Sequence, residues 1–533
     1  MLAENHLFHL FVTRLYRVLM WAALILLFGY LLVFLTYAAN LIQFPFDYDQ
    51  GEGFELVDTL LFSQGRWPWQ DVETWPFYSS NYPPLFHLLA VPFAWLFGPS
   101  YAYGRALGTL ATLIAAGAIA FAVRRDGGPG LLAPVSGLAF IASNTIYHIG
   151  PLNRQHMSMV MFETLAVVVL ANMEGTGDTQ KRRRTYWLGL LLILAAGYTK
   201  QLALATALAA IAFLFIRQPR RGLQMAVGLA LSGGAIFLLL TLATDGQWWL
   251  QTISANVNRY DPQQALGLLQ QWFGLHGFLV VPALLFLLYE LYVDRLSIYS
   301  VWLVAALAVG LFSGKWGAGD SYFSTAIAAT CILAGVGCTR LLANLSGKGT
   351  LRSALALLLI PLLFLGYARA VLHLPTLTAP FDSIAALLDV KPNALNGFYD
   401  SARGREGEFP PGYADIGHLT NGEDIRSGEE LVTLVRAADG PVLSEDASFA
   451  LLAGKEVVTN PTQLLNLANN GLYRGDALLQ MLQDQAFGLI ILRAGFFPGT
   501  VLQAIGENYE PDQVIRMNGF DYRLYRPKAE RAP

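Results

Sequence analysis

The chain carries the apolar sequence VLMWAALILLFGYLLVFLTYAA at residues 18–39 and, a few residues later, the acidic sequence FDYDQGEG at residues 46–53. The apolar run is uncharged and long enough to cross a bilayer as one helix. Asp47, Asp49 and Glu52 therefore lie where the chain leaves the lipid. A charge beside hydrocarbon is costly unless it has a partner or a function, so this cluster predicts an enzyme that works at the membrane surface.

The composition is that of a polytopic membrane protein. Of the 533 residues, 54% are hydrophobic and only 14% are charged, whereas soluble proteins carry about 25% charged residues. The net charge of −3 is too small to indicate a nucleic-acid partner. The two cysteines, Cys331 and Cys338, lie within one apolar run and cannot form a disulfide framework. Because no small-residue cleavage site follows the first apolar run, we interpret it as a retained anchor.

Ten further apolar segments follow the first one, which gives about eleven expected transmembrane helices. They lie at roughly 102–123, 130–148, 156–173, 186–199, 201–216, 223–243, 272–292, 298–314, 322–343 and 352–372. The segment 83–98 is short and contains three prolines, so we expect a juxtamembrane helix there. If it crosses the membrane instead, the topology changes.

The basic residues support the count of eleven. With the N-terminus in the cytoplasm, nearly every dense basic cluster falls inside, as the positive-inside rule requires. Counting 83–98 as a crossing would place the basic cluster at 181–184 outside. We therefore expect an integral, multi-pass protein of the plasma (inner) membrane with a cytoplasmic N-terminus. The functional site and the C-terminal domain are then extracytoplasmic, and membrane lipids are partners.

Two domains are expected. Residues 1–375 form an all-α polytopic membrane domain with a long first outer loop at 40–101, and residues 376–533 form a more highly charged soluble domain. In the second domain the apolar run at 488–492 predicts a strand, and 462–484 predicts a helix. The C-terminal domain is therefore expected to be α/β.

The first outer loop continues with an amphipathic pattern. Apolar residues recur with helical spacing from Gly53 to Gly65, which predicts a helix lying on the membrane that ends at this second glycine. An aromatic series follows, including Trp67, Trp69 and Tyr82. Such rings anchor at the headgroup level of a membrane, and they also stack on sugar faces.

The ordered set of features resembles a known superfamily. After the first span, the acidic cluster and the helix ending in glycine come NYPPL at 81–85, Phe97-Gly98 and YGRAL at 103–107. This order resembles the GT-C superfamily of membrane glycosyltransferases, in particular the branch that contains protein O-mannosyltransferases and aminoarabinose transferases. The resemblance is best from the first span to Arg105, looser over the rest of the membrane half, and slight over the C-terminal domain.

The resemblance implies an inverting glycosyltransferase. It would move a sugar from a polyprenyl-phosphate donor, on the outer membrane face, to a lipid, glycan or protein acceptor. A carboxylate of the first outer loop would deprotonate or orient the acceptor as a general base. Asp49 matches that position best, and Glu52 would share a helical face with it. Because the chain has Asp49-Gln50 in place of the usual Asp-Glu pair, the choice between the two carboxylates stays open. The alternative is structural, with Asp49 capping the helix and Glu52 completing a capping box.

A lipid phosphate also needs positive charge, because fixed cations stabilise the leaving group in the transition state. Four basic residues fall at or near outer ends of predicted spans, against the positive-inside trend. They are Arg105, Arg154, Lys200 and Lys315. We expect them to bind the donor phosphate. The alternative is that they snorkel or pair with local carboxylates such as Asp320.

Three further residues complete the predicted site. Tyr82, His156 and Asp320 are expected to line the substrate cavity. Where relatives often have an Arg-x-Asp pattern, this chain has Arg154-Gln155-His156. A second acidic ligand is therefore missing, which argues against metal dependence. Asp49, Glu52 and His156 are still candidate ligands for a divalent metal, with a merely hydrogen-bonded histidine as the alternative.

Two other classes of function remain open at this stage. One is a polytopic transporter or lipid flippase, although transporters tend to have repeated halves and no such repeat stands out here. The other is a non-catalytic scaffold of a cell-envelope assembly. Single replacement of Asp49 and Glu52 distinguishes a transferase, which would lose turnover, from a scaffold.

Overall fold

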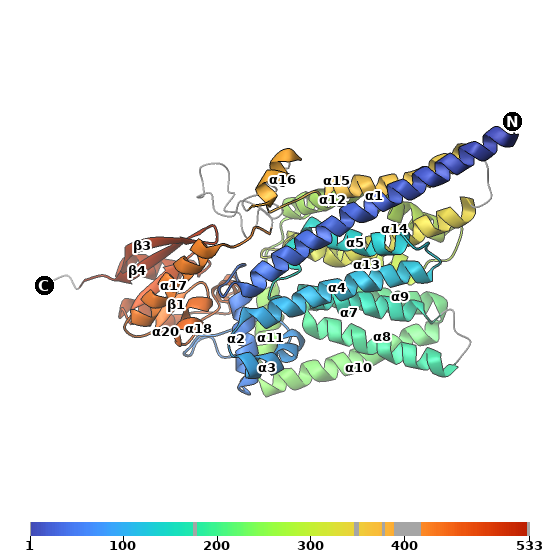
Figure 1. Ribbon diagram of the computed structural model, residues 1–533. Helices are drawn as coiled ribbons and strands as arrows, with labels where there is room; N and C mark the ends of the chain where they lie inside the picture. Colours follow the sequence, from blue (N-terminus) through green and yellow to red (C-terminus); the bar gives the residue numbers. More distant parts are fainter. Residues whose placement is uncertain (1, 174–178, 346–350, 376–378, 389–416, 530–533) are drawn as a thin grey trace.

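The structure is a computed structural model that describes residues 2–173, 179–345, 351–375, 379–388 and 417–529. It is mostly helical, with one small sheet near the C-terminal end of the chain. Long helices run side by side in a bundle, and the sheet lies with its own helices at one end of that bundle (Figure 1). The N-terminus lies at the opposite end.

Within the described residues, six helical segments are long and apolar enough to cross a membrane. They are Leu10–Gln43 of α1 (Leu2–Gln43), α4 (Tyr101–Arg125), α10 (Pro219–Ala243), α12 (Pro262–Tyr292), Asp320–Leu345 with α14 (Ser324–Leu345), and α15 (Leu351–Ala370). The chain is therefore an integral membrane protein. The predicted count of eleven crossings and the orientation of the chain stay predictions.

Further helices fill the bundle between these six. They are α5 (Leu132–Ala142), α6 (Asn144–Ile149), α7 (His156–Ala171), α8 (Thr179–Thr199), α9 (Leu204–Arg217) and α13 (Ile298–Gly310). The prediction of one continuous segment over 130–148 is wrong in one respect. The backbone of Ser143 leaves the helical conformation, so the segment forms two helices, α5 and α6. The Ser143 hydroxyl forms a 2.8 Å hydrogen bond with Nε2 of His276, which gives this break a polar partner inside the bundle.

The loop between α6 and α7 lies directly against α4. A Cβ atom at Gly104 would lie 1.7 Å from Oδ1 of Asn153, and one at Gly108 would lie 2.7 Å from the carbonyl oxygen of Leu152. These two glycines are four residues apart and so lie on one face of α4. Small residues let segments approach closely in membrane proteins. This contact fixes the position of Arg154, the next residue of the loop.

The first outer loop contains α2 (Glu52–Ser63) and α3 (Leu85–Phe97). At about 20 Å, α3 is too short to cross the hydrocarbon core. Gly65 follows α2 with φ of 70°, as its predicted role at the helix end requires. The expectation that α2 lies on the membrane surface is wrong, because its polar face is buried as well as its apolar face. Phe54 and Val57 pack in one cluster with residues of the C-terminal part of the chain, which covers the helix.

The C-terminal sheet has four strands in the order β1-β2-β4-β3. Strand β1 (Val442–Ser444) is parallel to β2 (Leu489–Leu492), and the antiparallel pair of β4 (Phe520–Pro527) and β3 (Tyr509–Met517) completes the sheet. Its helices are α17 (Gly422–Ala437), α18 (Ser448–Ala453), α19 (Pro461–Asn469), α20 (Asp476–Gln483) and α21 (Gly499–Asn508). The predicted helix over 462–484 is in fact two helices, because Gly471 and Gly475 adopt positive φ between them.

The sheet and the membrane helices share one hydrophobic core. The rings of Phe46 and Phe449 lie 6.1 Å apart at this junction, and the backbone N–H of Ser448 donates to Oδ2 of Asp47 at 3.2 Å. The acidic cluster after α1 therefore lies between the two parts of the chain. The predicted domain boundary at residue 376 lies outside the described residues.

Candidate active site

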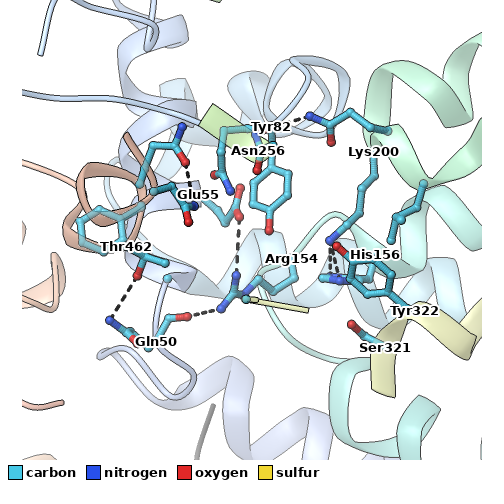
Figure 2. Close-up of a pocket in the computed structure, with 18 of the residues that line it drawn as sticks. Gln50, Glu55, Tyr82, Arg154, His156, Lys200, Asn256, Ser321, Tyr322 and Thr462 are labelled. Carbon is cyan, nitrogen blue, oxygen red and sulfur yellow. Dashed lines mark hydrogen bonds and ion pairs between the residues drawn. The ribbon is translucent and has the colours of Figure 1, made fainter. Parts of the chain in front are cut away.

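A cavity of about 320 Å³ lies where the helix ends, the first outer loop and the C-terminal part meet. Segments far apart in the sequence supply its walls. The lining residues include Asp49, Gln50, Gly51, Glu55, Asp58, Tyr82, His148, Arg154, His156, Lys200, Asn256, Lys315, Asp320, Asn460, Thr462 and Gln463. Figure 2 shows Lys200 and His156 pointing toward one another, with Arg154 close to Glu55 and Gln50.

Asp49 and Arg154 form an ion pair at the cavity wall. Oδ2 of Asp49 lies 2.6 Å from Nη2 and 3.0 Å from Nε of the guanidinium. Nη2 also donates to the carbonyl oxygen of Gln50. Both side chains keep a small exposed fraction, 13% for the carboxylate and 16% for the guanidinium. The pair is therefore well ordered yet open to a ligand in the cavity.

The turn into α2 brings the backbone close to Arg154. Gly51 occupies the N-cap position with φ of 97°, in the region where glycine is favoured. A Cβ atom there would lie 3.0 Å from Nη2 of Arg154. No side-chain hydrogen bond caps the helix, so Asp49 is the partner of Arg154 and not the helix cap.

Glu52 and Arg105 form a second ion pair, which is fully buried and does not line the cavity. Their closest contact is 2.8 Å between Oε2 and Nη2. The guanidinium also donates to the carbonyl oxygens of Leu41 and Phe46, and the carboxylate accepts the backbone N–H of Asn153 at 2.6 Å. Burial alone would raise the pKa of Glu52, but Arg105 and the backbone donors lower it.

This second ion pair connects several segments of the chain. It joins the end of α1, the acidic cluster, α4 and the loop that carries Arg154. The carboxylate and the guanidinium are both saturated by protein groups, and neither lines the cavity. The roles of base and phosphate ligand expected for Glu52 and Arg105 stay predictions. Of the two carboxylates, Asp49 is the one that lines the cavity.

Lys200 and Lys315 bring two further amino groups to the cavity. Nζ of Lys200 lies 2.6 Å from Nε2 of His156 and 4.7 Å from the ring centre of Tyr82. In the described part of the chain, neither lysine has a carboxylate oxygen within 4.0 Å of its Nζ. Burial lowers the pKa of both lysines, and the nearby Arg154 lowers that of Lys200 further. An anion bound beside them would favour their charged forms.

The remaining predicted lining residues also face this cavity. Burial raises the pKa of Tyr82 to about 12, against the opposing effect of Arg154. Oδ2 of Asp320 accepts a 2.8 Å hydrogen bond from Thr145. No ion pair joins Asp320 to any of the four predicted phosphate ligands among the described residues. The two nitrogens of His148, which the sequence did not single out, have no hydrogen-bond partner in this part of the chain.

The predicted metal ligands Asp49, Glu52 and His156 each have another partner. Asp49 binds Arg154, Glu52 binds Arg105, and His156 binds Lys200. Among the described residues, the metal-ligating atoms that do converge are those of Glu55, Asp58 and His87, all within 4.8 Å of one another. This buried group is able to hold a metal ion.

Sequence analysis did not single out Glu55, Asp58 or His87. Burial raises the pKa of Glu55 to about 7, although Arg154 and Lys200 oppose this shift. A signal was present, because Glu52, Glu55 and Asp58 recur at three-residue intervals and so mark one stripe of α2. On a helix that lies on the membrane surface such a stripe would face solvent, so it did not by itself indicate a site.

Comparison with solved structures places the chain among proteins with the GT-C glycosyltransferase fold, as the sequence resemblance implied. It is similar to ArnT, the aminoarabinose transferase, from Cupriavidus metallidurans, both in the apo state and bound to undecaprenyl phosphate. Each ArnT structure has a TM-score of 0.56 and 14% identity, over 93% of this chain and 98% of that chain.

The chain also matches the oligosaccharyltransferase of Archaeoglobus fulgidus, with a TM-score of 0.49 and 11% identity, over 95% of this chain and 74% of that one. Neither a protein-family model nor a curated protein sequence matches the chain. The comparisons therefore show its fold alone.

Proposed function

We propose that this protein is an inverting glycosyltransferase that moves a sugar from a polyprenyl-phosphate donor to an acceptor at the outer face of the membrane. The observation that carries this proposal is the composition of one cavity. Its wall holds the partly exposed carboxylate of Asp49 together with Lys200 and Lys315. The two lysines have no carboxylate partner in the described structure, so an anionic ligand is their natural complement.

The donor phosphate is assigned to the cations of the cavity. The guanidinium of Arg154 supplies positive charge, and Lys200 and Lys315 add N–H donors whose charged forms the bound phosphate favours. As the bond between the sugar and the phosphate breaks, negative charge grows on the phosphate, and such groups stabilise it. One of the ArnT structures contains bound undecaprenyl phosphate, which supports a polyprenyl phosphate as the carrier here.

Asp49 is assigned to the acceptor. The acceptor oxygen or nitrogen attacks the anomeric carbon from the face opposite the phosphate and forms the new glycosidic bond. The bond from the anomeric carbon to the phosphate oxygen breaks at the same time, and the electron pair leaves with the polyprenyl phosphate. The acceptor's proton passes to the carboxylate of Asp49. Displacement from the opposite face accounts for inversion.

The C-terminal part of the chain closes the cavity with polar, uncharged side chains. Asn460, Thr462 and Gln463 lie at the start of α19 and line the cavity. Oγ1 of Thr462 lies 3.5 Å from Nε2 of Gln50. Amide and hydroxyl groups of this kind pair with sugar hydroxyls, so we assign this wall to the sugar or to the acceptor.

The first test measures donor binding with the purified full-length chain in lipid nanodiscs. Undecaprenyl phosphate should bind with much higher affinity than undecaprenol. Lys200→Met and Lys315→Met should each weaken the binding of undecaprenyl phosphate at least tenfold. Asp512→Asn, at a carboxylate of β3 that does not line the cavity, is the control and should bind like the wild type. Equal binding of the alcohol and the phosphate would contradict the assignment of the cations.

The second test measures turnover. A panel of undecaprenyl-phosphate hexoses and pentoses is incubated with the protein and a membrane-lipid acceptor pool, and release of undecaprenyl phosphate is followed. Asp49→Asn should bind undecaprenyl phosphate but release it at least 100-fold more slowly than the wild type. A normal rate in this variant would reject the proposed base. Movement of the lipid-linked sugar across the bilayer without cleavage would indicate a flippase instead.

A further inference from the structure

Three buried acceptor atoms face one another between α2 and α3. Nε2 of His87 lies 3.4 Å from Oε2 of Glu55 and 3.7 Å from Oδ2 of Asp58. All three side chains are almost completely buried. Oε2 of Glu55 and Nε2 of His87 have no hydrogen-bond partner among the described residues. Such groups are rare in a folded protein, since burying them unpaired is costly.

The other ring nitrogen of His87 fixes the state of the imidazole. Nδ1 lies 3.2 Å from the carbonyl oxygen of Glu55 and 3.5 Å from the hydroxyl of Thr59. A carbonyl oxygen only accepts hydrogen bonds, so Nδ1 carries the proton and donates it there. In the neutral ring, Nε2 then presents a lone pair toward the two carboxylates. Three electron-pair donors therefore meet here, and among the described residues only Oδ2 of Asp58 accepts a hydrogen bond, from the Ser80 hydroxyl.

The spacing of these atoms fits a metal ion. Oxygen and nitrogen ligands lie about 2.0–2.2 Å from zinc in tetrahedral sites, which places neighbouring ligand atoms about 3.3–3.6 Å apart. Of the two distances from Nε2 of His87, 3.4 Å lies within this range and 3.7 Å lies just above it. One imidazole and two carboxylates form a ligand set that suits zinc.

Neighbouring groups hold the three ligands in place. The hydroxyls of Tyr78 and Ser80 donate to the two oxygens of Asp58. The ring of Phe62 stacks against that of His87, with centres 6.1 Å apart. A metal-bound histidine almost always donates its second N–H to a carbonyl or carboxylate, as His87 does to Glu55. Both the ligands and their supporting contacts are therefore preformed.

We propose that Glu55, Asp58 and His87 form a divalent metal site that takes zinc. The site joins α2 to α3 within the wall of the cavity, since Glu55 and Asp58 are also lining residues. A bound cation would neutralise the two carboxylates and fix the helix that follows the Asp49 loop. The proposal does not depend on the glycosyltransferase assignment, because it rests only on these three side chains and their neighbours.

The experiment measures metal content by mass spectrometry in the full chain, purified in detergent after loading with zinc and removal of free metal. The wild type should retain about one zinc per chain. His87→Gln, Asp58→Asn and Glu55→Gln should each retain less than a fifth of that amount. Fewer than 0.1 zinc per wild-type chain, or an undiminished amount in the three variants, would overturn the proposal.

His373→Gln is the matched control. Nδ1 of His373 likewise lies 2.8 Å from a backbone carbonyl oxygen, that of Val371, and its buried Nε2 has no hydrogen-bond partner within the described chain. Its neighbours are the rings of Tyr30 and Tyr147 and not carboxylates. This variant should keep its zinc.

A second measurement keeps the test decisive if a ligand variant folds poorly. The chelator 1,10-phenanthroline should lower the melting temperature of the wild type by several degrees, and equimolar zinc should restore it. The same treatment should leave the melting temperature of any folded ligand variant unchanged. A wild type that loses no stability on chelation would contradict a metal that joins α2 to α3.

Discussion

Nη2 of Arg154 lies 2.6 Å from Oδ2 of Asp49, so one cation of the cavity directly holds the carboxylate assigned to the acceptor. The two residues are 105 positions apart in the chain. The contact couples the two halves of the proposed reaction, because a phosphate that attracts the guanidinium also changes the charge beside the base. Arg154 is thus expected to affect both donor affinity and turnover.

The first prediction concerns this arginine. Arg154→Lys keeps the charge but loses the two-pronged contact with Asp49, since a lysine is a single point of charge. We expect turnover to fall on the order of 10- to 100-fold in this variant, and further in Arg154→Ala. Release of undecaprenyl phosphate from the lipid-linked sugar measures both effects. Arg474→Ala, at an exposed side chain of the C-terminal part, should have no effect. Unchanged turnover in Arg154→Ala would remove this residue from the site.

The second prediction separates the two ion pairs. Breaking a buried pair by removing one partner costs about 3–5 kcal/mol, so Glu52→Gln and Arg105→Met should markedly lower the melting temperature and the yield of folded protein. Asp49→Asn should change stability little, since its side chain is partly exposed and only one face of it is held. Thermal unfolding by intrinsic fluorescence measures the difference. A stable but inactive Glu52→Gln variant would return Glu52 to the catalytic candidates.

The third prediction concerns pH and Asp47. Burial raises the pKa of this carboxyl to about 7, and the neighbouring Asp446 and Glu52 act in the same direction, while Ser448 and Arg493 oppose them. Since the folded state holds the proton more tightly than the unfolded state, the contribution of this group to stability decreases as the pH rises from about 4 to about 7 and is constant above. The melting temperature should therefore fall by several degrees between pH 5 and pH 8.

The matched variants for this test are Asp47→Asn and Asp512→Asn. The first removes the titrating group at the junction and should flatten the pH dependence. Its melting temperature should compare most favourably with that of the wild type at pH 8. The second changes a partly exposed carboxylate of β3 that pairs with Arg526 and should keep the wild-type profile. Parallel profiles for the wild type and Asp47→Asn would show that Asp47 does not cause the dependence.

Part of the cavity was predictable because its residues adjoin ends of apolar segments. Asp49 follows the first span, and Arg154, Lys200 and Lys315 each lie next to another helix end. Helix ends on one side of a bundle lie close together, so the charge pattern indicated a common site. The membrane class and the GT-C fold were predictable for a similar reason, since hydropathy and the order of motifs are local properties of the chain.

The rest depends on contacts that no local pattern contains. The sequence pattern left the choice between Asp49 and Glu52 open, although Asp49 matched the family position best. The structural difference between them comes from Arg105, which lies 53 residues from Glu52 and saturates it. The burial of the polar stripe of α2 could not be predicted, because the segment that covers this helix lies about 400 residues further along the chain. Thr462 contacts Gln50 across 412 positions, and nothing in either local sequence indicates that pairing.

The last prediction uses the two glycines that flank α2. Gly51 and Gly65 both have positive φ, 97° and 70°, so an alanine at either position imposes a backbone strain on the order of 1 kcal/mol. Their surroundings differ. A Cβ atom at Gly51 would meet the guanidinium of Arg154 at 3.0 Å, whereas one at Gly65 would have no atom within 4 Å.

Gly51→Ala and Gly65→Ala should therefore lower the melting temperature by similar, small amounts, because the strain of the backbone is common to both. Only Gly51→Ala should also lower turnover, by roughly tenfold, because its methyl group displaces the guanidinium from Asp49. Thermal unfolding and release of undecaprenyl phosphate, measured on the same preparations, separate the two effects. Equal losses of turnover in both variants would mean that the helix as a whole, and not the contact of Arg154 with Asp49, limits the reaction.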